Sequence, residues 1–263
     1  MTDGAPKTRI RFGWNCCRIR PNMMQTGILS PTNIHWPELP EWQSAAKLID
    51  HTLLAPETTR QQVERLCRET VAYGFHSVMV NPGRLALAVS LVRGSGVLAA
   101  TVIGFPFGAT TTTAKLAEAA DALKLGAREL DMVINIGALK SGERDLVESE
   151  ICALSSLAHR SRALLKVILE TALLTTEEKI LACQLCLRAK ADFVKTSTGF
   201  SSAGASVADV ALMRGVVGHE MGVKAAGGIR SAADLAAMVE AGANRIGTSA
   251  GVSIVQSMGA PVS

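Results

Sequence analysis

The chain has 263 residues, of which 48% are hydrophobic and only 4% aromatic. This length fits one large α/β domain or two smaller ones, and aliphatic residues suit helices that pack on parallel strands. The net charge of +4 is small and concentrates in the first forty residues, so the composition excludes a broad basic face of the kind that binds nucleic acid. No apolar run approaches the ~20 residues that a membrane span needs.

The six cysteines do not form the spacing of a disulfide framework, and we expect a reduced, cytoplasmic protein. Cys183 and Cys186 form a C-x-x-C pair, which in other contexts is redox-active or binds a metal. The pair lies within a helical pattern over residues 177–188 that has no second pair of ligands nearby. We therefore interpret the two thiols as small apolar residues on a buried helix face.

Residues 1–40 differ from the rest of the chain. They are rich in Arg, Asn and Pro, poor in acids, and lack a clear period. Such a segment resembles a transit peptide, but it lacks the apolar stretch of a secretory signal. We predict an irregular or disordered extension over residues 1–40 and a single domain over residues 41–263, which begins with a short helix at Glu41–Ala46.

Beyond residue 46 the chain alternates apolar, strand-like runs with longer helical patterns. Helices are predicted from Pro56, over Thr111–Leu125 and over Ser231–Gly242, the last two with hydroxyl caps and terminal glycines. The predicted strands are Lys47–Thr52, Ser77–Asn81, Leu98–Ile103, Glu129–Asn135, Leu165–Glu170, Asp192–Thr196, Gly222–Ala226 and Asn244–Thr248.

Eight strands that alternate with helices, without a glycine-rich dinucleotide motif after the first, favour an α/β fold of the (β/α)₈ barrel type over a doubly wound sheet. In such barrels the active site forms at the carboxyl ends of the strands. The unusual polar residues should therefore gather at one mouth of the barrel.

Lys195 is the first of these residues, because it interrupts the apolar run of the sixth predicted strand. A buried ammonium is costly unless it is paired or its pKa falls. With a lowered pKa, a lysine amine can attack a carbonyl and form a Schiff base. The alternative is an ordinary lysine that extends from the strand end to solvent.

Asp131 and Lys224 should join Lys195. Alternation along the fourth strand directs Asp131 into the barrel, and Lys224 lies on the seventh strand. A nearby Lys224 would lower the pKa of Lys195, while Asp131 would balance charge and exchange a proton. The competing hypothesis is a buried salt bridge between Asp131 and one lysine, with the other lysine in solvent.

Glycines after the seventh and eighth strands predict a phosphate site. Gly227 and Gly228 follow the seventh strand, and Gly247 and Ser249 belong to Ile246–Ser249 at the end of the eighth. Thr198 and Gly199, after the sixth strand, could add donors. The alternative is that these glycines only form tight turns.

From about Ile49 to Gly251 the chain resembles the deoxyribose-phosphate aldolase family. Members of this family are class I aldolases with a (β/α)₈ barrel fold. The motifs that carry the resemblance are long and ordered along the chain: DHTLL at 50–54, VNP at 80–82, VIGFP at 102–106, ELDMVIN at 129–135, KVILET at 166–171, KTSTG at 195–199, KAAGGIR at 224–230 and RIGTS at 245–249.

The resemblance implies a reversible cleavage of 2-deoxy-D-ribose 5-phosphate into acetaldehyde and D-glyceraldehyde 3-phosphate, in the catabolism of deoxyribonucleosides. Lys195 would form the Schiff base, with Asp131 and Lys224 as the proton relay. The substrate-binding residues would be Asp50, Thr52, Asn81 and Thr198, and the phosphate-binding residues would be Gly199, Gly227, Gly228, Gly247 and Ser249.

The resemblance also implies a homo-oligomer, a dimer or a tetramer, that acts on phosphosugars and aldehydes. No cofactor or metal is expected, since an iminium serves as the electron sink and the five histidines are scattered. Two departures from the family bear on rate and substrate closure: Ala250 replaces a serine found in many members, and the chain ends at Ser263 without the terminal tyrosine of some members.

Two other functions remain open from the residues. A different phosphosugar enzyme, such as an isomerase, would use the same phosphate loops but would leave the paired lysines unexplained. A non-catalytic phosphosugar sensor would keep the pocket without the chemistry.

Overall fold

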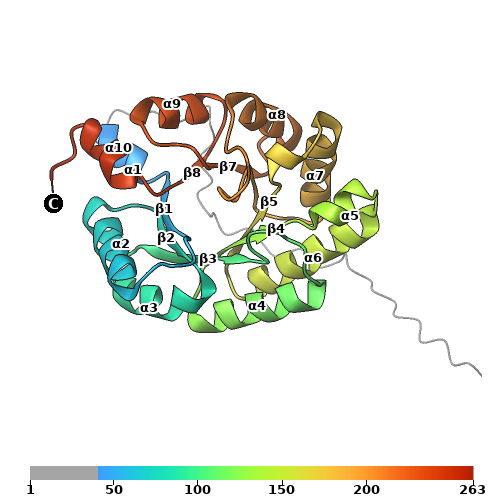
Figure 1. The fold of residues 1–263 in the computed structure, drawn as a ribbon, viewed down its shortest axis with the longest axis horizontal. Helices are drawn as coiled ribbons and strands as arrows, with labels where there is room; N and C mark the ends of the chain where they lie inside the picture. Colours follow the sequence, from blue (N-terminus) through green and yellow to red (C-terminus); the bar gives the residue numbers. More distant parts are fainter. Residues whose placement is uncertain (1–40, 263) are drawn as a thin grey trace, which may run out of the picture.

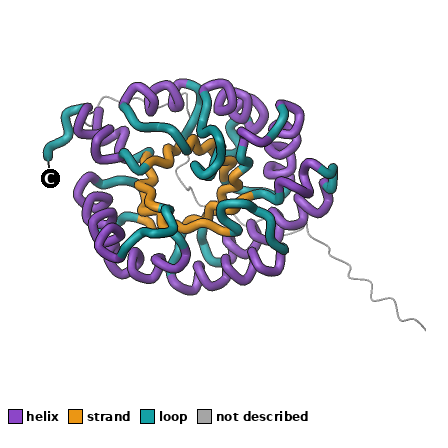
Figure 2. The backbone as a smooth tube through the Cα atoms, viewed as in Figure 1, coloured by secondary structure: helices purple, strands orange, loops and turns teal. Residues whose placement is uncertain are grey.

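Eight parallel strands close into a barrel in chain order, with β8 hydrogen-bonded back to β1. The computed structural model describes residues 41–262, and Figures 1 and 2 show the ring of strands with helices around it. The predicted (β/α)₈ fold is confirmed. The strands are β1 Ile49–Leu53, β2 Ser77–Val80, β3 Leu98–Ile103, β4 Glu129–Val133, β5 Leu164–Ile168, β6 Phe193–Lys195, β7 Gly222–Ala226 and β8 Arg245–Thr248.

Helices connect successive strands and cover the outside of the barrel (Figure 2). They are α1 Glu41–Ala46, α2 Arg60–Tyr73, α3 Pro82–Val92, α4 Thr112–Leu125, α5 Ile136–Lys140, α6 Arg144–Arg160, the 3₁₀ turn η2 Thr171–Leu173, α7 Thr176–Arg188, α8 Val207–Val217, α9 Ala232–Glu240 and α10 Gly251–Ser257. No helix among the described residues is both long and apolar enough to span a membrane.

The caps explain most helix boundaries. In α4, Thr111 accepts a hydrogen bond from the Ala114 amide and Gly126 ends the helix in a left-handed conformation, as predicted. The prediction that a helix begins at Pro56 is wrong, because α2 begins at Arg60. Thr59 and Gln62 form a reciprocal capping box there, while the Thr58 hydroxyl donates to the Ala55 carbonyl in the preceding turn.

Each strand presents one face to the helices and one to the barrel interior. Leu130, Met132 and Ile134 pack in the large core between β4 and the helices. A separate small apolar cluster consists of Leu54, Met79, Ala100 and Val102, with Phe105 packed against it. These residues lie on or just after β1, β2 and β3, so this side of the barrel is apolar.

Cys183 and Cys186 are buried in α7 and both are free thiols. Burial raises the pKa of Cys183 to about 12, which makes the thiolate inaccessible at neutral pH. The interpretation as buried helix residues agrees with this placement. The extension predicted over residues 1–40 lies outside the described residues.

Candidate active site

The register of the barrel places three cations side by side on neighbouring strands. Lys195 of β6 is the Cα partner of Lys224 of β7, and Lys224 is the partner of Arg245 of β8. Like charges directly across a sheet destabilise it, and buried charges need partners. Carboxylates from elsewhere in the barrel must therefore offset this row.

Asp131 of β4 meets both lysines at one oxygen. Its Oδ2 accepts from Lys195 Nζ at 2.8 Å and from Lys224 Nζ at 2.9 Å. Lys166 of β5, the register partner of Asp131, donates to Oδ1 at 2.9 Å. Lys195 and Lys224 are both buried, so the hypothesis of one salt bridge and one solvent-exposed lysine is wrong.

A second layer of charges lies beneath these groups. Lys166 Nζ donates to Glu129 Oε2 at 2.5 Å, and Arg245 donates to the same carboxylate at 3.0 Å. Arg245 also donates to Asp50 Oδ1 at 2.9 Å, and Lys224 donates to Asp50 Oδ2. We call this set of seven buried groups the charge cluster: Asp50, Glu129, Asp131, Lys166, Lys195, Lys224 and Arg245.

Ion pairing keeps the carboxylates of the charge cluster ionised. Burial alone would raise the pKa of Asp131, but Lys166, Lys195 and Lys224 outweigh it and hold that pKa far below its ordinary value. For Glu129, burial also raises the pKa, but Lys166 and Arg245 lower it to a net value of about 2. Three anions therefore persist at neutral pH.

The pKa of Lys195 moves in the opposite direction to those of Lys166 and Arg245. Burial lowers its pKa most, Asp131 opposes, and Lys224 and Lys166 lower it further, with a net value of about 8. Lys166 is equally buried, yet its carboxylate neighbours raise its pKa. When Lys195 is neutral, the remaining three cations balance the three anions of the charge cluster. The arrangement thus supplies a free amine near neutral pH, which is what a Schiff-base lysine requires.

Asp50 pairs with buried cations, and its predicted contact with the substrate remains a prediction. Both of its oxygens accept hydrogen bonds, from Lys224 and from Arg245 and Ser77, and the residue is fully buried. Asp50 belongs to the charge cluster, where it fixes Lys224. Thr52 and Asn81 are half-buried near the end of β1 and after β2, with Asn81 Nδ2 donating to the Leu54 carbonyl.

The loops after β6 and β7 are packed together, where we predict the phosphate site. The Ala205 amide donates to the Gly227 carbonyl at 3.0 Å. A Cβ on Gly204 would come within 2.2 Å of that oxygen, so only glycine fits. Gly199, Gly227 and Gly228 all have positive φ, a conformation that glycine adopts without strain. The loops thus present backbone groups at a surface suited to an anion. Gly228 and Ser249 are exposed there, and Gly227 is half-buried.

Gly247 has a separate structural reason to be glycine. It is buried inside β8, and a Cβ there would lie 3.0 Å from Lys224 Cε and 3.0 Å from Ala226 Cβ. The missing side chain makes room for the Lys224 stem beside Asp131. Its predicted role at the phosphate remains a prediction.

Both hydrogen-bond donors of Thr198 have a partner within the chain, and its predicted contact with the substrate remains a prediction. Its amide donates to Glu170 Oε2 at 3.2 Å and its hydroxyl donates to the same oxygen. Glu170 is buried and has φ 57° and ψ 63°, a left-handed conformation that costs a residue other than glycine about 1–2 kcal/mol. Both donors of Thr198 therefore bind the buried carboxylate of Glu170, whose backbone is strained.

Sequence reasoning missed four residues of this region as site residues: Glu129, Lys166, Glu170 and Arg245. Each occurs within a motif that was recognised, but none was assigned a role. The alternation that placed Asp131 inside the barrel also places Glu129 there, so that signal was available. Lys166 and Arg245 depend on cross-strand register, which the pattern of one strand does not determine.

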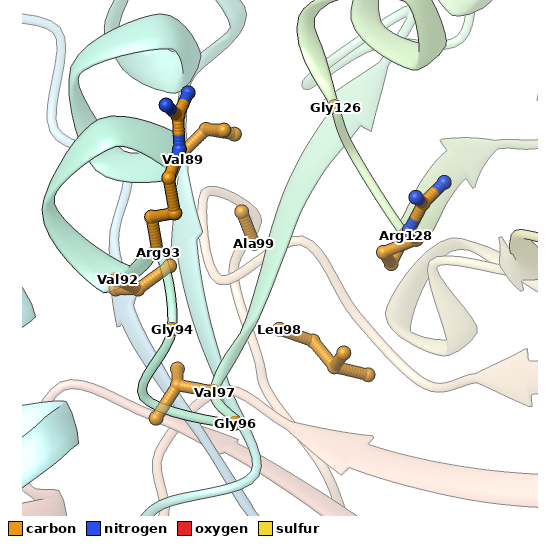
Figure 3. Close-up of a pocket in the computed structure, with 10 residues that line it drawn as sticks. All are labelled: Val89, Val92, Arg93, Gly94, Gly96, Val97, Leu98, Ala99, Gly126 and Arg128. Carbon is orange, nitrogen blue, oxygen red and sulfur yellow. The ribbon is translucent and has the colours of Figure 1, made fainter.

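A shallow cavity of about 360 Å³ lies at the opposite face of the barrel, around the start of β3 and the ends of α3 and α4. Figure 3 shows its lining, which includes Arg93 and Arg128 among valines and glycines. It contains none of the charge cluster, and active sites of such barrels form at the other face.

One group among the described residues has metal-ligand spacing: Asp50, His76 and Glu129. Its carboxylates already accept from Lys224, Lys166 and Arg245. These cations account for the group, and a metal ion would have to displace them.

Comparison with known proteins agrees with this geometry. The model of the DeoC/LacD family of aldolases matches residues 44–258. Deoxyribose-phosphate aldolase of Lysinibacillus sphaericus is 55% identical over 216 residues, which cover 82% of this chain and 96% of the relative. The Thermococcus gammatolerans enzyme of the same name is 57% identical, over 80% of this chain and 95% of the relative.

Solved structures show the same relationship. The tetrameric deoxyribose phosphate aldolase of Aeropyrum pernix superposes with a TM-score of 0.79 and 37% identity, covering 85% of this chain and 94% of that one. Lys195 at the end of β6 shares one aspartate with a second buried lysine, an arrangement that suits a Schiff-base aldolase. The chain belongs to the DeoC/LacD family of aldolases, which confirms the family predicted from the sequence.

Proposed function

We propose that this protein is a class I aldolase that reversibly cleaves 2-deoxy-D-ribose 5-phosphate into acetaldehyde and D-glyceraldehyde 3-phosphate. The observation that carries the proposal is the shared oxygen of Asp131, which holds Lys195 and Lys224 at 2.8 and 2.9 Å inside the barrel. Relatives of the same name, at more than 50% identity over four fifths of the chain, support the same substrate.

The first step is attack of the neutral Lys195 amine on the C1 carbonyl of the open-chain sugar. Loss of water leaves a protonated imine at C1. The bond between C2 and C3 then breaks, its electron pair moves into the iminium to form an enamine, and the C3 hydroxyl loses its proton to become a carbonyl. The iminium is the electron sink for this step.

Two proton transfers complete the reaction: one removes the proton from the C3 hydroxyl and one protonates the enamine at C2. Asp131 and Lys224 are the groups beside Lys195 that can carry them, through a bound water. Asp131 is held as a carboxylate, because the cations around it keep its pKa far below its ordinary value, and it can accept the proton of the C3 hydroxyl. Lys224, which donates to Asp131 Oδ2 at 2.9 Å, can deliver a proton to C2 and take one back from Asp131. Hydrolysis of the imine then releases acetaldehyde.

The phosphate group would bind at the packed loops after β6 and β7, with Gly199, Gly227 and Gly228, and near Ser249 after β8. Asn81 and Thr52 would lie along the substrate. We further propose a homo-oligomer, supported by the tetrameric relative from Aeropyrum pernix. A reduced, cytoplasmic setting is supported by the buried free thiols of Cys67, Cys183 and Cys186.

Borohydride reduction in the presence of the sugar phosphate tests the mechanism. Reduction of the iminium should leave a stable secondary amine on Lys195, detected by peptide mass spectrometry, with no adduct when substrate is omitted. Lys179, which is paired with Asp209 outside the barrel interior, is an internal control that should stay unmodified. An unmodified Lys195 peptide would contradict the mechanism.

Release of acetaldehyde tests the substrate separately. An isomerase would consume the phosphosugar without releasing acetaldehyde, and a sensor would bind it without turnover. Either result would replace the proposed function while leaving the family unchanged.

A further inference from the structure

Glu170 lies beside the Schiff-base strand, and its backbone is held on both sides. The Leu169 amide donates to the Lys195 carbonyl at 2.9 Å, and the Thr171 amide donates to the Thr196 carbonyl at 3.0 Å. The left-handed backbone of Glu170 falls between these two bonds. A strained residue that its surroundings fix so firmly at the end of a barrel strand is typical of a functional position.

The contact with Thr198 determines what that threonine can do. A threonine hydroxyl has one proton and two acceptor positions. The proton goes to Glu170 Oε2, and one acceptor position takes the Phe200 amide at 3.0 Å. Thr198 therefore keeps a single acceptor position and no donor.

The second carboxylate oxygen of Glu170, Oε1, adds another hydrogen-bond acceptor beside Thr198. Oε1 is buried and accepts no hydrogen bond from the residues that the structure describes. Glu170 Oε1 and Thr198 Oγ1 are thus two acceptors near the end of the strand that carries Lys195. An anion is repelled by a carboxylate, whereas a hydroxyl group can donate to it.

We infer that Glu170 is a positioning residue that holds Thr198 as a hydrogen-bond acceptor for the hydroxyl-bearing half of the substrate. The inference rests on the proposed function, because it assumes a substrate that carries hydroxyl groups beyond the carbonyl that Lys195 attacks. Glu170 does not take part in the chemistry at C1. In this arrangement Thr198 binds a substrate hydroxyl, and the glycine loops bind the phosphate.

Two reactions of the same enzyme test this role. Cleavage of 2-deoxy-D-ribose 5-phosphate needs the hydroxyl-bearing half, whereas exchange of the methyl protons of acetaldehyde in D₂O needs only Lys195 and its proton relay. Glu170→Gln should lower kcat/KM for cleavage by about 10- to 100-fold, the range expected for a lost hydrogen bond to a charged group. The exchange rate, followed by NMR, should stay within about twofold.

Variants of Thr198 keep the test independent of how Glu170→Gln folds. Thr198→Val should lose cleavage to a similar extent, and Thr198→Ser, which keeps the hydroxyl, should recover most of it. The matched control is Glu178→Gln, since Glu178 is a carboxylate in the capping box of α7 and its change should alter neither reaction.

Unchanged cleavage in Glu170→Gln and Thr198→Val would overturn the inference. Equal losses of cleavage and exchange would also overturn it, because Glu170 would then support the Lys195 strand and not the substrate. Failure of the proposed function looks different: the wild-type protein would exchange acetaldehyde protons but would not cleave the sugar phosphate.

Discussion

The interior of the barrel has two unlike sides. Toward β1–β3 it is lined by the apolar cluster of Leu54, Met79, Ala100 and Val102. The charge cluster lies mainly on β4–β8, with Asp50 of β1 as its one member from the other side, and most of its contacts measure 2.5–3.1 Å. The apolar side excludes water, so the charges opposite act in a medium of low dielectric constant, where their mutual effects are large.

Within the charged side, Lys166 and Lys195 show what the arrangement achieves. Both are buried on adjacent strands. Lys166 pairs with Glu129 and Asp131 and lies 3.8 Å from Asp50, whereas Asp131 is the only carboxylate paired with Lys195 within residues 41–262. The pKa of Lys166 is raised and that of Lys195 is lowered to about 8. Burial therefore does not by itself make a nucleophile; the number and placement of carboxylates decide which lysine loses its proton.

The largest effect is expected for Lys195→Met. Loss of the amine should lower kcat for cleavage by at least ~10⁴-fold, because no other group forms the imine. The melting temperature should not fall, since the substitution removes an amine whose charge is penalised by burial and leaves Asp131 with Lys166 and Lys224. Lys166→Met is the contrast: it strips both Glu129 and Asp131 of a partner and should destabilise the fold.

A smaller loss is expected for Lys224→Met, which should lower kcat by about 10²- to 10⁴-fold through the proton relay. It should also change the pH profile. In the wild type, activity should rise with pH toward a midpoint near the Lys195 pKa of about 8, because the protonated amine is not nucleophilic. Removal of a neighbouring cation favours protonation of Lys195, so the midpoint should move to higher pH. A shift to lower pH would contradict this electrostatic account.

Glu129→Gln should shift the same midpoint in the opposite direction by a smaller amount. It removes an anion from the charge cluster, which makes protonation of Lys195 harder and lowers the midpoint. Because Lys166 and Arg245 lose a partner, unfolding should become easier by about 3–5 kcal/mol. Kinetics across pH, together with denaturant titration, measures both effects, and an unshifted midpoint would confine Glu129 to a structural role.

The smallest effect is expected for Met79→Leu on the apolar side. The volume is conserved, so the loss of stability should stay below about 1.5 kcal/mol, with cleavage activity within about twofold. A large loss of activity without a loss of stability would show that the apolar side contacts the substrate directly.

Much of the fold was predictable from the sequence, because apolar runs and glycine stops mark the strands and helices to within about two residues. The start of α2 was missed because Pro56–Thr59 contains several residues that favour a first turn, and the capping box at Thr59 and Gln62 decides among them. In the site, alternation placed Asp131, and the positions of Lys195 and Lys224 in apolar predicted strands marked both lysines. The roles of Lys166 and Glu170 depend on contacts between neighbouring strands, which a single sequence leaves open.

The charge cluster also has a consequence for how the chain folds. Its members come from six strands, from Asp50 on β1 to Arg245 on β8. A barrel that lacks its first or last strand would bury Glu129 and Lys224 with some of their partners missing, at a cost of several kcal/mol. Partial barrels are thus penalised, and closure of β8 onto β1 should make unfolding of residues 41–262 an all-or-none transition.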